Sequence, residues 1–438
     1  MKGLAYAAVA VLTLSALPAG GAELTRTISG FEDGMTFPFG IDLQVSYDRY
    51  QHRALINREN HQNGDITDVA ELRITEVKQE LPIRLAIGLY HDLELHASLP
   101  IILGWSRNYG YPSITNSGTS SVANNCVSAR GGYDCATQGG FAGQPGGYYD
   151  ANKQVSRRGV GDLTVGVAWG VLSEKRDDTK PTWVLGFDYT YPLASSIDPS
   201  IPTSSSNPGN VGAKVQLFEP YMAISKRVGH VDPYLKISAT IPHLLGGFHS
   251  NCDDDPSQIV AFPENCPGGG DANATWTRQD TGEKPPYMGT VVFGTELYAY
   301  DAPEKNQSLT IDLRGTGQFV SEGRYYNEMS DQLGKLLFTE QYLHMGATFG
   351  INFRGAKYVE LRLAASYWHD TDHFLTNENV GTDLSGDGKV DLPGSPDAPD
   401  TSGEINPGYD FRWDGVGRRF RIGQVNDFEF SATGVLTF

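Results

Sequence analysis

The stretch that decides the fold is Phe428-Glu429-Phe430-Ser431-Ala432-Thr433-Gly434-Val435-Leu436-Thr437-Phe438. Apolar and mostly polar residues alternate along it, and it ends on an aromatic residue. Successive side chains of a β-strand point to opposite faces, so this pattern predicts a strand with one apolar and one mostly polar wall. An apolar strand end is an aggregation hazard in water. The pattern therefore favours a strand whose apolar wall faces lipid.

This closing strand resembles the insertion signal of bacterial outer-membrane β-barrels. The resemblance makes Phe438 a candidate assembly signal and the barrel-assembly machinery an expected partner. A closed barrel leaves no free strand edge. We therefore also expect the last strand to pair antiparallel with the first, Phe39 to Tyr47, so that Phe438 is the periplasmic end of the closing seam.

Residues 1–22 read as a secretory signal peptide. A short positive start precedes an almost wholly apolar run, Leu4 to Leu17, and small residues follow up to an expected cleavage site after Ala22. The apolar run is too short to span a bilayer, and no run of about twenty apolar residues follows it. We expect residues 23–438 to form one barrel domain.

The composition is acidic, with a formal net charge of −18. This balance argues against nucleic-acid binding, which needs a basic surface. It fits a surface that meets divalent cations, or simply a solvated acidic surface. Gly and Tyr are abundant, at 51 and 22 residues, as expected for an exported barrel with long surface loops.

Four cysteines occur as two local pairs in polar, Gly-rich segments: Cys126 with Cys135, and Cys252 with Cys266. In an oxidising compartment this arrangement predicts two disulfides, each stapling one loop. A metal site is the weaker alternative, because neither pair has the close spacing or the neighbouring histidines of a zinc site.

Twelve period-two strands follow one another from Phe39 to Phe438, joined alternately by long and short connections. This alternation and the even number are typical of an all-β transmembrane up-and-down antiparallel β-barrel, whereas a soluble sandwich does not require them. We expect the long connections to be extracellular; they include 106–158, 243–286 and 370–418, and the first spans His52 to Asp68. Leu72 and Ile74 fall on the wrong parity, for which we expect a β-bulge before Glu80.

If the apolar parity faces lipid, the other parity lines the lumen. The candidate lumen residues carry both signs of charge: Arg84, Glu94, His96, Asp188, Asp312, Arg314, His344, Glu360 and Arg362. They predict either a polar pore or a packed lumen whose ion pairs hold the wall together. Twelve strands lie between the eight that fill their own interior and the sixteen that leave an open channel, so a plug formed by an inward-folded loop is also open.

The segment Asp383 to Asp391 resembles the first nine positions of an EF-hand calcium loop. Oxygen ligands would come from Asp383, Ser385, Asp387 and Asp391. The twelfth position is Gly394 instead of a glutamate, so a solvated acidic loop is the alternative. Calcium is the one cofactor that the sequence suggests.

Two motifs resemble a group of outer-membrane barrels named after the MetA-pathway phenol-degradation protein. They are Gly159-Val160-Gly161-Asp162-Leu163-Thr164-Val165-Gly166-Val167 and the hairpin Ala86 to Leu95. The resemblance implies a channel for small, often aromatic or hydrophobic compounds. It supplies no binding residues that can be carried over to this chain.

We therefore expect an outer-membrane channel or transporter for passive passage of small molecules, in the outer membrane of a Gram-negative bacterium. Its partners would be outer-membrane lipid, lipopolysaccharide and a small solute. We expect no enzymatic activity. The competing hypothesis is a non-transporting, surface-anchored barrel whose acidic, disulfide-stapled loops bind calcium, lipopolysaccharide or another cell.

Overall fold

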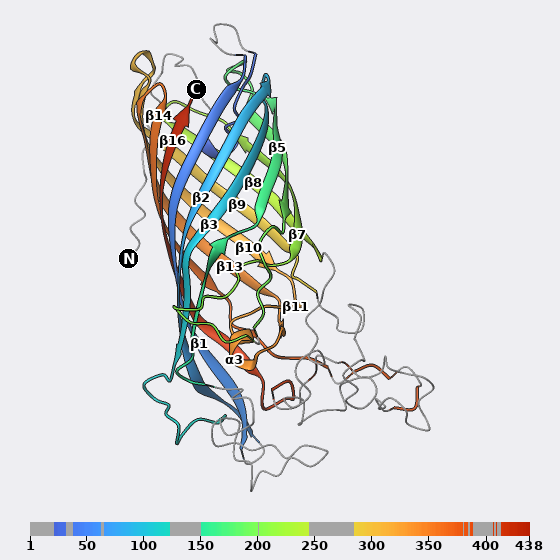
Figure 1. Cartoon of the computed structure of the whole chain (residues 1–438). Coiled ribbons are helices and arrows are strands. Elements are labelled where there is room, and N and C mark those ends of the chain that lie inside the picture. Colours follow the sequence, from blue (N-terminus) through green and yellow to red (C-terminus); the bar gives the residue numbers. More distant parts are fainter. Residues whose placement is uncertain are drawn as a thin grey trace, which may run out of the picture.

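The computed structural model describes residues 22–31, 38–62, 65–122, 150–199, 201–244, 284–379, 381–383, 386–388, 406, 409 and 413–438. Twelve long strands form a closed antiparallel barrel, seen from the side in Figure 1. Both the predicted fold class and the predicted number of strands are confirmed. Residues 1–21 of the predicted signal peptide and all four cysteines lie outside the described residues.

The barrel strands follow the chain order, with one break that is described below. Their bounds are β1 Gly40–Gln62, β2 Asp65–Tyr90, β3 Leu93–Gly110, β5 Leu163–Leu172, β6 Thr182–Tyr191, β7 Val215–Ser225, β8 Val231–Leu244, β9 Met288–Ala302, β10 Gln307–Val320, β13 Tyr342–Ala356, β14 Val359–Asp370 and β16 Phe420–Thr437. The smaller elements are η1 Glu23–Thr25, β4 Gln154–Val160, η4 Pro303–Lys305, β11 Gly323–Tyr325, α3 Ser330–Leu333, β12 Leu337–Thr339 and β15 His373–Phe374. No helix in the described part of the chain is long and apolar enough to cross a membrane.

The seam between β1 and β16 closes the barrel as predicted. The two strands pair antiparallel over most of their length, with Leu43 opposite Leu436. At its end the backbone N–H of Phe438 donates to the carbonyl of Ile41 at 2.8 Å, and the N–H of Ile41 donates back at 3.1 Å. Phe438 is thus hydrogen-bonded into the wall.

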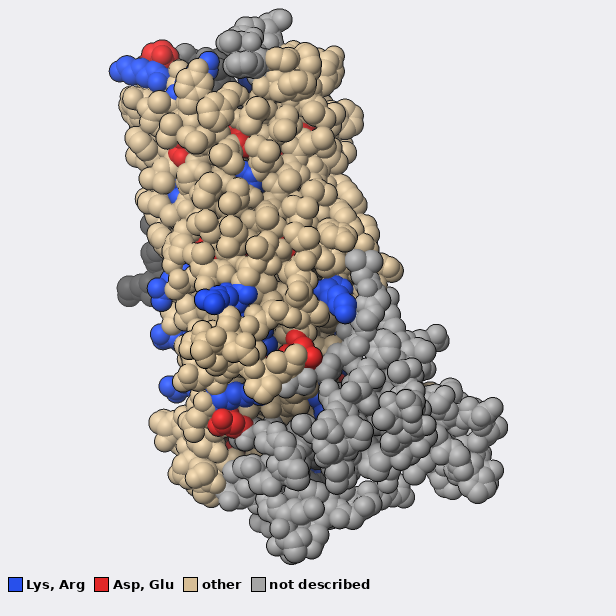
Figure 2. Space-filling view, in the orientation of Figure 1, with Lys and Arg blue, Asp and Glu red and all other residues tan. Residues whose placement is uncertain are grey.

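The outer wall is apolar over a broad band. Large side chains stand open on it, with Phe293 60%, Phe353 51% and Phe430 46% exposed. Figure 2 shows a surface mostly without charged atoms, followed by a level near the loops where Lys and Arg gather; Arg49 and Arg53 are exposed just beyond the apolar part of β1. A closed barrel with such a band is the architecture of bacterial outer-membrane proteins. The protein is an outer-membrane β-barrel.

Strands β1 and β2 continue far beyond this band, which corrects two predictions. The expected loop from His52 to Asp68 is wrong, because these residues extend the two strands almost to their turn. A β-bulge does occur on β2 before Glu80, because Glu71 is an extra residue against β1. It precedes Leu72, however, and the shift between Gln79 and Glu80 has its extra residue, Leu103, on β3, so neither changes the parity between Leu72 and Glu80. Leu72 and Ile74 therefore keep the inward parity.

Their inward position is explained by a hydrophobic core inside the extracellular end of the barrel. Leu72 and Ile74 are fully buried there. The strand and loop residues of this core are Ala54, Ile56, Leu72, Ile74, Tyr109, Val122, Ala151, Val155, Met329, Leu333, Leu337, Leu375, Trp413, Phe420, Ile422 and Val425. We call this cluster the extracellular core.

The wall is interrupted next to β3. The periplasmic part of β3 pairs with β5 and its extracellular part with β4, and the break lies at Gly161 and Asp162. The Asp162 carboxylate accepts the backbone N–H of Ala194 at 2.9 Å and thereby holds the following loop at the break. This explains physically the aspartate of the first family motif.

Candidate functional site in the barrel lumen

The N-terminal segment occupies the periplasmic mouth of the barrel. Ala22 and Thr25 are 0% and 1% exposed. The backbone N–H of Ile28 donates to Glu94 Oε2 at 2.8 Å, and Ser29 Oγ donates to Asp92 at the same distance. These backbone and hydroxyl contacts follow no periodic pattern, so alternation along the chain could not predict the position of this segment. It forms a periplasmic plug, which we define as residues 22–30.

Besides Glu94, two more of the predicted lumen residues hold this plug. Arg362 Nε donates to Glu360 Oε1 at 2.6 Å, and its Nη1 contacts the Glu23 carboxylate. Arg26 extends from the plug to Glu360 at 3.2 Å and to Asp42 at 3.4 Å. Carboxylates and guanidinium groups alternate across this site, so charges of the plug and of the wall balance each other.

Four of the predicted lumen residues form one network on the extracellular side of the periplasmic plug. Arg84 contacts Glu94 at 2.6 Å, while His96 contacts Glu94 at 3.1 Å and Asp188 at 2.8 Å. Gly166 leaves space for the contact between His96 and Asp188, because a Cβ there would lie 2.1 Å from the Asp188 carboxylate and 2.4 Å from the His96 ring. A glycine of the first family motif is thus required by the histidine–aspartate contact.

Asp312 and Arg314 form a further predicted pair, at 2.6 Å. Tyr234, which the sequence did not single out, joins them: its hydroxyl donates to Asp312, and Arg314 Nε donates to the hydroxyl at 3.2 Å. Its position on β8, facing the lumen between charged strands, was the available signal.

His344 lies at the outer end of the lumen, in a cluster that the sequence did not predict. It contacts Asp370, and ligand atoms of His344, Asp370 and Asp427 lie within 4.8 Å of one another. His52 Nδ1 is 2.7 Å from Asp427, and the Tyr50 hydroxyl donates to the same carboxylate at 2.6 Å. Imidazoles, rather than Arg or Lys, accompany both carboxylates.

The loop between β10 and β13 covers the extracellular mouth, and we call residues 321–340 the extracellular plug. It reaches the opposite wall, where Asp331 contacts Arg157 at 2.7 Å and Arg107 at 3.4 Å. The Tyr109 hydroxyl donates to the Glu328 carbonyl at 2.6 Å. Burial alone would raise the pKa of Asp331, but the two guanidinium groups outweigh it and hold this pKa below its usual value.

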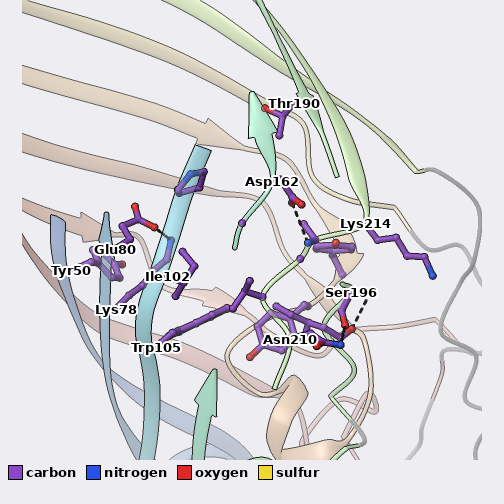
Figure 3. A pocket seen from close by; sticks show the side chains of 18 of the residues that line it. Tyr50, Lys78, Glu80, Ile102, Trp105, Asp162, Thr190, Ser196, Asn210 and Lys214 are labelled. Atoms are coloured by element: carbon purple, nitrogen blue, oxygen red, sulfur yellow. Dashed lines mark hydrogen bonds and ion pairs between the residues drawn. The ribbon is translucent and has the colours of Figure 1, made fainter. Parts of the chain in front are cut away.

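Between the network around His96 and the extracellular plug lies a cavity of about 1210 Å³, part of which is shown in Figure 3. Its walls combine aromatic side chains, Tyr50, Trp105, Tyr325, Tyr326 and Trp368, with polar groups. It extends to the strand break at Gly161 and Asp162.

The cavity wall has an excess of acidic side chains. Asp48 lies opposite Glu80 in the strand pairing, and Glu429 lines the same cavity. Lys78 pairs with Glu80 at 2.7 Å. Within the described residues, no Lys, Arg or His lies within ion-pair distance of Asp48 or Glu429. A cation or a hydrogen-bond donor is therefore the complementary occupant.

The calcium motif lies on the outside of this site and is described only in part. The Asp383 carboxylate accepts the N–H groups of Gly386 and Gly388, at 2.6 and 2.8 Å, as in a turn. Asp387 is described, whereas Ser385 and Asp391 lie outside the described residues. Calcium binding here stays a prediction.

The chain matches no protein-family model, and no curated protein matches it by sequence. Among solved structures it is similar to an outer membrane channel from Pseudomonas putida F1, with 12% identity over 93% of this chain and 98% of that one and a TM-score of 0.41. A Pseudomonas aeruginosa FadL homologue has 11% identity over 91% and 90% of the chains and a TM-score of 0.34. The TodX monoaromatic hydrocarbon channel (deltaS2 mutant) has 8% identity over 96% and 95% and a TM-score of 0.32. We draw no functional argument from likenesses this distant.

Proposed function

We propose that the protein is an outer-membrane channel for passive passage of small amphipathic molecules. The single observation that carries the proposal is the cavity of about 1210 Å³ in the lumen. A volume of this size exceeds that of a drug-sized ligand site, and an aromatic wall with a few polar groups is typical of small-molecule sites. A barrel that served only as an anchor would have no need of such a space.

The wall chemistry favours neutral or positively charged aromatic solutes. The aromatic side chains of the wall offer apolar surface to an aromatic solute. Two of them, Trp105 and Tyr326, already hold the Arg157 guanidinium over their rings, at 5.3 and 5.2 Å from the ring centroids. The carboxylates of Asp48 and Glu429 favour a cation and disfavour an anion. We therefore expect selection by charge as well as by size.

Residues of the two plugs line the lumen cavities at both ends of the barrel, so we expect passage to require their movement. The extracellular plug is held by Asp331 against Arg107 and Arg157. The periplasmic plug is held by Arg362 and Arg26. We therefore favour gating by release of these ion pairs over a polar pore without moving parts.

Uptake into liposomes that contain the purified protein tests the proposal. Benzylamine, benzyl alcohol and benzoate have similar size but different charge, and we expect entry to decrease in that order. Replacing Asp48→Asn together with Glu429→Gln should reduce the preference for benzylamine several-fold. Asp68→Asn is the matched control, because Asp68 forms an exposed ion pair with Arg421 outside the lumen. Equal entry with and without the protein would contradict a channel.

A non-transporting surface barrel is the second candidate, and the extracellular core favours it. This core seals the mouth with buried side chains such as Trp413 and Met329, which are 2% and 0% exposed. If solutes fail to enter even after the extracellular plug is released, the anchor function is preferred. We keep the prediction that the protein is not an enzyme.

Two membrane partners complete the proposal. Arg49, Arg53 and Arg73 are exposed at and beyond the outer boundary of the apolar band, where guanidinium groups can pair with lipopolysaccharide phosphates. We expect the barrel-assembly machinery to recognise the last strand with Phe438. Replacing Phe438 by Ala should reduce the amount of folded barrel before it changes solute entry.

A further inference from the structure

Two carboxylates face each other inside the periplasmic half of the barrel. Asp232 on β8 lies directly opposite Glu296 on β9. Their exposed fractions are 0% and 4%. Like charges directly opposite in a sheet destabilise it, and burial makes the repulsion stronger.

This pair lacks the counterion that two other periplasmic carboxylates, Glu360 and Asp312, have. Glu360 has three arginines and Asp312 has Arg314. For Asp232 and Glu296, the described part of the chain supplies no Lys, Arg or His within ion-pair distance. The Ser225 hydroxyl and the Ala22 N–H lie beside Asp232, but neither makes a hydrogen bond of ordinary geometry to its oxygens. A buried acidic pair of this kind is stabilised either by a proton that neutralises one carboxyl or by a cation from elsewhere.

The periplasmic plug brings its backbone to this pair. The backbone N–H of Glu23 donates to Glu296 Oε1 at 2.8 Å. The peptide bond between Ala22 and Glu23 is the cleavage site predicted from the sequence. The nitrogen that cleavage would release is therefore the nitrogen already placed at Glu296.

We propose that Asp232 and Glu296 are the binding site for the α-ammonium group of the processed chain, which begins at Glu23. Hydrolysis of the Ala22–Glu23 peptide bond by a signal peptidase consumes one water. It leaves a carboxylate on Ala22 and an amine on Glu23, which takes up a proton because the pKa of an α-amino group is about 8. A single N–H donor becomes a cation with three donors. This cation supplies the missing counterion and fixes the periplasmic plug in the barrel.

The structure of the site thus makes correct processing a condition for a tightly held plug. An uncleaved or extended chain presents only a neutral amide to the two carboxylates. The inference is independent of which solute crosses the barrel, since it concerns the stability of the plug.

The first test is the intact mass of protein extracted from outer membranes, which should correspond to a chain that starts at Glu23. The second compares two refolded chains in detergent, one beginning at Glu23 and one carrying Gly-Ser before it. We expect the extended chain to unfold several degrees lower and its N-terminal segment to be cleaved faster by protease. A different first residue in the native protein would overturn the proposal.

The two added residues could also lower stability simply by their size. To distinguish this from loss of the ammonium group, the comparison is repeated in a chain that carries both Asp232→Asn and Glu296→Gln. If the ammonium is the cause, the difference between the two chains disappears in this background. If the difference persists unchanged, the extension acts by its size and the proposal is wrong. The matched control is Asp301→Asn, at a periplasmic carboxylate that already pairs with Arg227 at 2.7 Å; there the difference should remain.

Discussion

The membrane-embedded part of the barrel and its extracellular extension consist of the same strands but have opposite polarity. In β1, Val45 points outward to lipid and Asp42 inward to the lumen, whereas farther along Arg53 points outward and Ile56 inward. The pairing with β2 keeps one register between these positions. The two faces of β1 therefore keep their directions along the whole strand. Only the surroundings of each face change where the strand leaves the membrane.

The apolar parity of a strand therefore identifies the side that is shielded from water, but which side this is depends on whether the strand lies in the membrane or beyond it. In the membrane the outer wall meets lipid and the lumen holds paired charges. Beyond it the outer wall meets water, and the inner wall meets the extracellular plug. Leu72 and Ile74 are therefore the point at which one strand leaves the bilayer, not a sign of a bulge.

Releasing the extracellular plug should have the largest effect. Asp331→Asn leaves the buried Arg157 without its carboxylate, while Arg107 keeps Glu76 at 2.6 Å. Removing one partner of a buried ion pair costs about 3–5 kcal/mol. We expect hydrogen exchange of residues 329–337 to accelerate while the membrane strands stay protected. The folded pKa of Asp331 is lowered, so in the wild type this stabilisation is present above about pH 4 and lost only as the pH falls below it. Equal protection in both proteins at pH 7 would contradict the ion-pair assignment.

Shortening a side chain of the extracellular core should have the next largest effect. Leu72→Ala removes a fully buried side chain and should destabilise this end by about 2–5 kcal/mol in urea unfolding. The control on the same strand is Ile83→Ala, whose side chain is 36% exposed on the lipid-facing wall. A smaller loss for Leu72 than for Ile83 would show that the extension is not packed inside.

The third largest effect is expected from placing a charge at different positions on the outer wall of β1. Val45→Arg places a charge in the apolar band and should cost about 2–4 kcal/mol in folding into lipid vesicles. Arg53→Val, the reverse change eight positions farther along, should alter stability by less than about 0.5 kcal/mol because Arg53 is exposed beyond the band. Similar losses for both variants would place the membrane boundary elsewhere.

Calcium should have the smallest effect. If Asp383 and Asp387 belong to a calcium loop, calcium at ten times its dissociation constant stabilises the folded chain by about 1.4 kcal/mol. The expected result is a small rise in unfolding temperature in millimolar calcium, absent in Asp383→Asn. An unchanged temperature in the wild type would favour the solvated acidic loop.

The sequence was sufficient for features that repeat along each strand. The strand count, the seam at Phe438 and the inward parity of Arg84, Glu94 and His96 follow from alternation alone. The plugs could not be predicted this way, because Ile28 is held through its backbone N–H and Asp331 meets Arg157 only after a loop crosses the mouth. The apolar residues change faces at Leu72, and this is visible in the sequence. A β-bulge and a membrane boundary both explain such a change, and a sequence does not mark where the membrane ends.

The central claim is that the lumen conducts small solutes once the extracellular plug is released. Single-channel recording in planar bilayers tests it directly, comparing the wild type with Asp331→Asn. We expect rare openings for the wild type, frequent openings for the variant, and a reversal potential that favours cations because Asp48 and Glu429 line the cavity. A variant whose plug is shown by hydrogen exchange to be released, yet which carries no current, would contradict the claim.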